Sequence, residues 1–142
     1  MTVETTELTL PSRIESVEGA AVLIARVLGS SGVSEEVAFA VDIAVREAVT
    51  NAILHGNKQD ESKAIHVTAR TFANSMEITV ADEGEGFDPA NVPNPTESEN
   101  ILKTSGRGIF FIRTFMNDVE WVVRPGGGTT VKMMKSFLKD DQ

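Results

Sequence analysis

A long amphipathic helix between Ser34 and Gly56 is the sequence feature that most constrains how this chain folds. Ser34 is a favoured helix N-cap, Gly56 is a favoured helix stop, and the residues between them are apolar or good helix formers. This pattern predicts a helix that buries one face in a protein core. The residues that recur at the helical period and define that face are Val37, Val41, Ala44, Ala48 and Ala52.

Three polar residues, Glu47, Asn51 and His55, follow one another at four-residue intervals along this helix. They are therefore expected to stack on one side of it over two turns. A solvated polar stripe is one explanation of the pattern. The flanking residues are largely apolar, however, and polar groups that leave water need partners. A carboxylate and an amide oxygen in this arrangement can also hold a Mg²⁺ ion that takes its remaining ligands from water and substrate phosphates.

The composition indicates one acidic domain. At 142 residues with 41% hydrophobic content, the chain is long enough for a single domain, residues 1–142, with its own core. A net charge of -8 argues against nucleic-acid binding, which needs clustered Lys and Arg. The absence of cysteine excludes thiolate chemistry, and two histidines do not favour a zinc site. Because neither a secretory leader nor a membrane-length apolar run is present, we expect a soluble, cytoplasmic protein.

The remaining pattern predicts a sheet and one further helix. Residues 4–10 alternate like an edge strand that Pro11 ends, and residues 16–28 have helical periodicity with a glycine-rich exit at 29–32. Two antiparallel hairpins follow, each with a short turn between alternating segments. The first is formed by residues 65–72 and 76–82, and the second by residues 119–124 and 129–137.

Asp82 ends the first hairpin and places its carboxylate on the apolar face of the strand, where a charged residue is not expected. It has the same parity as the apolar residues of its strand, so it points toward the face that packs against the helices. A bare charge there costs several kcal/mol if it has no partner. Thr129, on the second hairpin, shares the parity of Val131 and also points inward. The two side chains can satisfy each other, or they can together bind the amine of a ligand.

Two glycine-rich segments flank a long polar stretch. Gly84 and Gly86 follow Asp82 and let the backbone lie close to a ligand, although a surface turn has the same signature. Residues 88–105 are polar, contain prolines and lack a period, which is typical of a disordered loop or of a lid over a ligand. Residues 105–108 then lead into an apolar run. They predict either an ordinary tight turn or a helix N-terminus whose amides favour a phosphate.

Together, residues 47–57, 82–86, 106–108 and 128–130 resemble the N box, the two glycine boxes and the closing Gly-Thr segment of the GHKL ATPase superfamily. That superfamily includes gyrase, Hsp90, MutL and histidine-kinase catalytic domains, and the four segments occur here in its order. Within that superfamily the chain is similar to the anti-sigma-factor serine kinases. The similarity lies in its small size, its leading strand and helix, and the sequence Glu-Ala-Val-Thr-Asn-Ala. The resemblance implies an α+β fold, the Bergerat two-layer α/β sandwich, with a mixed, mainly antiparallel sheet that helices cover on one face.

The resemblance also implies roles for individual residues. Asn51 would bind Mg²⁺, and Asp82 would accept the adenine amine with help from Thr129. Glu47 would take the proton of a substrate hydroxyl, or would activate water as in the ATP-hydrolysing relatives. The ATP-binding residues implied in this way are Asn51, His55, Asn57, Asp82, Gly84, Gly86, Lys103, Gly106, Arg107, Gly108 and Thr129.

One departure from the family concerns the basic residue near the phosphates. The serine kinases often place it just before the second glycine box, where this chain has Lys103 followed by Thr104. Arg107 lies inside the box, at a position that is frequently apolar in relatives. Either cation can contact the γ-phosphate, since phosphoryl transfer draws much of its catalysis from such charges. Arg107 is the favoured candidate.

The function implied is that of an anti-sigma-factor serine/threonine protein kinase. It would use Mg-ATP to phosphorylate a STAS-type anti-anti-sigma antagonist, and it would sequester a sigma factor, as a homodimer. The alternatives are an ATP-dependent partner-switching module that transfers no phosphate, and a stand-alone GHKL ATPase. A detached histidine-kinase domain is disfavoured because no phosphoacceptor helix is evident and His66 is expected to be an exposed strand residue. A gyrase-like or Hsp90-like engine is disfavoured because no transducer domain follows Gln142.

Overall fold

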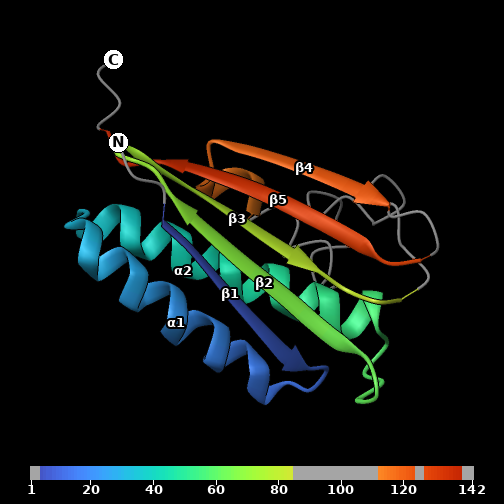
Figure 1. The fold of residues 1–142 in the computed structure, drawn as a ribbon. Helices are drawn as coiled ribbons and strands as arrows, with labels where there is room; N and C mark the ends of the chain where they lie inside the picture. The colour runs from blue at the N-terminus through green and yellow to red at the C-terminus, as the bar shows by residue number, and fades with distance from the viewer. Residues whose placement is uncertain (1–3, 85–111, 124–126, 139–142) are drawn as a thin grey trace, which may run out of the picture.

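The computed structural model describes residues 4–84, 112–123 and 127–138, which form a helical layer against one sheet (Figure 1). The five strands have the order β1-β2-β3-β5-β4, and every neighbouring pair is antiparallel. The two-layer α+β fold is confirmed, and the pairing among the described strands is antiparallel throughout rather than mixed. The elements are β1 (Glu4–Pro11), α1 (Glu15–Ser31), α2 (Glu35–Asn51), the π-helical turn η1 (Ala52–Gly56), β2 (Ala64–Thr71), β3 (Ser75–Ala81), β4 (Asp118–Val123) and β5 (Thr129–Ser136).

Both helices begin close to the predicted residue, whereas α1 ends later than predicted and α2 ends at Asn51, from which the turn η1 continues to Gly56. Ser34 caps α2, and its Oγ accepts a hydrogen bond from the backbone N–H of Val37 at 3.2 Å. The first helix runs past Gly29 and ends at Gly32, which has a φ of 65°. A glycine inside a helix costs only about 1 kcal/mol, so Gly29 did not stop it. No helix within the described ranges is both long and apolar enough to cross a membrane.

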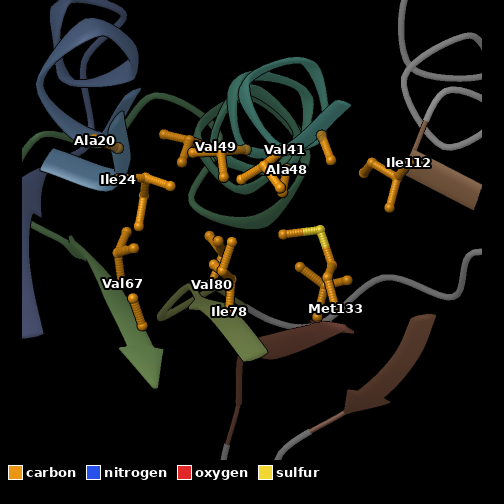
Figure 2. Close-up of a cluster of buried hydrophobic side chains, with 14 of the residues drawn as sticks. Ala20, Ile24, Val41, Ala48, Val49, Val67, Ile78, Val80, Ile112 and Met133 are labelled. Atoms are coloured by element: carbon orange, nitrogen blue, oxygen red, sulfur yellow. The ribbon is translucent and has the colours of Figure 1, made fainter. Parts of the chain in front are cut away.

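The core lies between the two helices and the inner face of the sheet. Figure 2 shows Val41 and Val49 of α2 facing Ile78 and Val80 of β3, with Ile24 of α1 beside them. All five side chains are at most 1% exposed. The apolar face predicted for α2 is confirmed, because each of its members is buried: Val37, Val41, Ala44, Ala48 and Ala52.

Helices α1 and α2 leave the outer face of the sheet uncovered (Figure 1), and most of the side chains on this face are polar. Glu77 of β3 is only 9% exposed there, and it lies between Arg70 of β2 and Lys132 of β5. The nitrogen-to-oxygen distances are 3.5 Å to Arg70 and 3.4 Å to Lys132. These two cations compensate the burial of the carboxylate, so Glu77 has a structural explanation.

Candidate functional site

Asp82 is buried directly after β3, with 1% of its surface exposed. Its Oδ1 accepts hydrogen bonds from the backbone N–H groups of Gly84 and Thr129, each at 3.0 Å. Its own backbone N–H donates to the carbonyl of Thr129, also at 3.0 Å. Such charge-assisted bonds offset part of the desolvation of the carboxylate. The expectation that Asp82 and Thr129 point inward and lie together is confirmed.

Three glycines around Asp82 are packed so closely that no side chain would fit on them. A Cβ on Gly56 would overlap the Asp82 carboxylate, and a Cβ on Gly128 would overlap the Asp82 carbonyl. A Cβ on Gly84 would overlap the carbonyl oxygen of Gly56. Gly128 also has a φ of 94°, a conformation that favours glycine. The end of η1, the segment after β3 and the start of β5 therefore meet backbone against backbone.

This close contact predicts that Gly84→Ala destabilises the protein by about 1–3 kcal/mol, because neither Gly84 nor the carbonyl of Gly56 belongs to a flexible side chain that can yield. The matched control is Gly29→Ala in α1, where an added Cβ meets nothing within 4 Å. That variant should gain up to about 1 kcal/mol from helix propensity. Denaturant unfolding measures both. Equal stability of the Gly84 variant and the wild type would contradict the packing described.

Asn57 joins three segments near Asp82. Its Nδ2 donates to the Oγ of Ser12 at 2.5 Å and to the carbonyl of Ala64 at 3.0 Å, and its Oδ1 accepts the backbone N–H of Glu83 at 2.7 Å. The side chain is 1% exposed. Both amide hydrogens are already used, so Asn57 holds the site together rather than offering a donor to a ligand.

The polar stripe of α2 continues regularly from Glu47 to Asn51 but not on to His55. After Asn51 the chain winds as the π-helical turn η1, in which the N–H of Asn57 bonds the carbonyl of Ala52 at 2.8 Å. This turn holds one residue more than an α-turn, so the four-residue stack predicted for a regular helix is not kept. Glu47 and His55 are half-buried.

Asn51 and Asp82 line the same small cavity, whose volume is about 10 Å³, room for about one water. Asn51 is 5% exposed, and its Nδ2 has no hydrogen-bond partner among the residues that the structure describes. Buried polar atoms are rarely left in this state, and an unsatisfied amide beside a buried carboxylate favours a polar ligand. The remaining lining residues are Thr129 and the apolar Ala48, Ala52, Val80, Ile112, Trp121 and Val131.

The other predicted site residues lie outside the described ranges. They are Gly86, Lys103, Gly106, Arg107, Gly108 and the expected lid at 88–105. One contributor was not predicted from the sequence. Trp121 lines the cavity, and its inward parity beside Val131 was the signal for it. His66 lies on β2 with 42% of its side chain exposed, as expected, and its Nε2 lies 2.7 Å from the Oε2 of Glu83.

His55 provides a pH-dependent test of burial near the site. Burial lowers the pKa of its imidazole below the ordinary value of 6.5. As the pH falls below 6.5, the unfolded chain binds a proton that the folded chain does not, so stability decreases until the folded pKa is reached. We expect thermal unfolding between about pH 7.5 and 5.5 to show this loss in the wild type and a smaller loss in His55→Gln. An identical slope in both proteins would contradict the expectation.

Comparison with known proteins places the geometry in context. Residues 10–135 match the family described as the histidine kinase-like ATPase domain. The serine-protein kinase RsbW of Staphylococcus epidermidis is 32% identical over 143 residues, which cover 96% of this chain and 88% of the relative. The anti-sigma F factor of Clostridium perfringens (strain SM101 / Type A) is 39% identical over 100 residues, which cover 68% of this chain and 71% of the relative.

The fold is similar to that of a solved structure. The RsbU and RsbW domains of a Mycobacterium tuberculosis protein superpose with a TM-score of 0.68 at 18% identity. The match covers 93% of this chain and 32% of that longer chain, so this chain spans about a third of it. At this identity the likeness bears on the fold alone.

Proposed function

Because the chain belongs to the histidine kinase-like ATPase domain family, and within it to the group of anti-sigma-factor serine kinases, we propose a specific reaction for it. The protein transfers the γ-phosphate of ATP to a serine or threonine of a STAS-type anti-anti-sigma antagonist, and it sequesters a sigma factor. We place this activity in the cytoplasm and expect a homodimer. One observation carries the proposal: the buried carboxylate of Asp82 and the unsatisfied amide of Asn51 line one cavity.

Asp82 is the proposed recognition group for the adenine amine. A carboxylate has two oxygens and about four lone-pair sites, so it can accept the amine while it also accepts the backbone N–H groups of Gly84 and Thr129. Those two groups hold it in place before the nucleotide arrives, which lowers the ordering needed on binding. Thr129, whose backbone clamps Asp82, adds a hydroxyl at the same wall.

Asn51 is the proposed protein ligand of Mg²⁺. Among the described residues no group of three or more His, Cys, Asp or Glu side chains could hold a metal without help. Mg²⁺ suits this situation, since it is usually held by one or two protein oxygens together with waters and substrate phosphates. The Asn51 amide fits because it is buried at the cavity and carries an oxygen, the ligand type that Mg²⁺ takes. When bound, the ion neutralises charge on the phosphates.

Glu47 is the proposed general base. It lies one helical turn before Asn51 on α2, and it is half-buried. Its carboxylate accepts the proton of the substrate hydroxyl as that oxygen attacks the γ-phosphorus. The bond from the γ-phosphorus to the β–γ bridging oxygen breaks, and ADP leaves with the electron pair. A serine hydroxyl is a weak nucleophile at neutral pH, so it benefits from such a base.

Phosphate contacts from Arg107, or from Lys103 in its place, remain part of the proposal, as do backbone contacts from Gly86, Gly106 and Gly108. They rest on the resemblance of their segments to the glycine boxes.

The test combines calorimetry with labelling. Purified protein is titrated with Mg-ATP and is then incubated with γ-labelled ATP and candidate STAS proteins, beside Asn51→Ala. We expect the wild type to bind ATP and to label a serine or threonine, and the variant to lose Mg²⁺-dependent affinity. ATP binding without labelling of any candidate would favour the partner-switching module. ATP hydrolysis without protein labelling would favour the stand-alone ATPase, and absence of ATP binding would overturn the proposal.

A further inference from the structure

Trp121 lies on the inner face of β4, where it pairs with Val131 of β5. It lines the same cavity as Asn51 and Asp82, and it is the only tryptophan of the chain. The other described walls of the cavity are aliphatic or polar. Trp121 is therefore the one aromatic surface that the described residues offer to a ligand at this place.

Arg113, which lies in the short helical segment before β4, contacts the Trp121 ring. Its guanidinium carbon lies 5.0 Å from the centroid of the Trp121 ring, which is within the range of a cation–π contact. Arg113 is itself exposed, and it precedes β4 in the chain. The contact packs a cation against the indole, and outward movement of the indole would change this contact.

The walls of the cavity differ in how readily they can yield. Between the described walls the cavity has room for about one water, so a purine that enters it needs one of these walls to shift. The Asp82 wall is confined by backbone contacts with Gly56 and Gly128. Trp121 stands on β4, which is the terminal strand of the described sheet and is paired on one side only (Figure 1). The Trp121 wall is therefore the one expected to move.

We propose that Trp121 is the base-stacking residue of the nucleotide site: its indole moves outward when the nucleotide binds and packs against the purine ring. This inference rests on the proposed function and adds a residue to it. In this proposal the nucleotide base is recognised by two side chains, Trp121 and Asp82. Stacking supplies affinity for any purine because every base has a π-face, whereas the Asp82 carboxylate distinguishes adenine by its amine.

The experiment measures the Kd of Mg-ATP and of Mg-ITP, whose base carries an oxygen in place of the amine, by calorimetry. Trp121→Leu should weaken both nucleotides by about tenfold and leave their ratio unchanged. Trp121→Phe, which retains an aromatic ring, should stay within about threefold of the wild type. The matched control is Val122→Ala, the next residue on the opposite face of β4, 46% exposed, which should change neither Kd.

The fluorescence of the single tryptophan provides a second readout of nucleotide binding. Its emission in the wild type should change on titration with ATP. Unchanged emission together with an unchanged Kd in Trp121→Leu would overturn this inference and leave the proposed function standing. A changed ratio of ATP to ITP affinity in Trp121→Leu would also overturn it, since stacking does not read the amine. If the leucine variant does not fold, the emission of the wild type decides the question. Failure of the wild type to bind ATP by calorimetry would instead overturn the proposed function.

Discussion

Replacement of Glu47 by glutamine is expected to lower the rate of phosphotransfer to the protein substrate by about 10² to 10⁴-fold, the usual contribution of a general base. Glutamine has nearly the same shape as glutamate and cannot accept the hydroxyl proton. The Kd of Mg-ATP should stay within about threefold, because the amide still fills the half-buried position on α2 and only the transition state requires the base. The loss should therefore appear in kcat rather than in the KM for ATP.

Single-turnover labelling of the protein substrate with γ-labelled ATP measures this loss, and calorimetry measures the affinity. The matched control is Glu36→Gln, which removes an exposed carboxylate from the first turn of the same helix. That variant should label its substrate at the wild-type rate. A Glu47 variant that binds ATP and labels as fast as the wild type would remove Glu47 from the mechanism.

Replacement of Asp82 by asparagine is expected to weaken ATP binding by about 100-fold or more. Losses of this size are typical when a buried polar group of a binding site meets a ligand group with which it cannot form a hydrogen bond. The asparagine oxygen can still accept the backbone N–H groups of Gly84 and Thr129. Its NH₂ group then takes the place of the second carboxylate oxygen, so two donors would face each other when the adenine amine enters. Conversion of two charge-assisted bonds to neutral ones should also destabilise the fold by about 1 kcal/mol.

Calorimetry with ATP and ITP separates these effects from general damage. ITP lacks the amine, so Asp82→Asn should lose much less affinity for ITP than for ATP. The matched control is Glu77→Gln, which neutralises a buried carboxylate on the outer face of the same sheet, between Arg70 and Lys132. Glu77→Gln should lower stability without changing the Kd of ATP. Equal losses for ATP and ITP in Asp82→Asn would show that Asp82 supports the fold rather than reading the base.

The local elements were predictable because their signals are local. The N-cap at Ser34, the buried face of α2 and the two hairpins follow from residue type and period over a few positions. The inward direction of Asp82 follows in the same way, because side chains alternate strictly along a strand. These features needed no knowledge of distant parts of the chain.

The π-helical turn and the role of Asn57 were not predictable in this way. Residues 51–57 contain a helix stop at Gly56 but no local signal that the helix should widen before it. The turn leads directly into tertiary contacts: Asn57 bonds Ser12, Ala64 and Glu83, which lie up to 45 residues away in the chain. Gly56 must at the same time pass directly against the Asp82 carboxylate.

The sequence alone therefore indicated the candidate site residues and determined which way most of the described ones point, because period and parity are properties of one helix or one strand. Only the tertiary structure decided which of them meet. Asn51, Asp82 and Trp121 share one cavity because α2, β3 and β4 converge there, and that convergence depends on contacts between segments far apart in the chain. Long-range packing of this kind has no signature in a local window, so the aromatic wall and the backbone contacts around Asp82 emerged only from the fold.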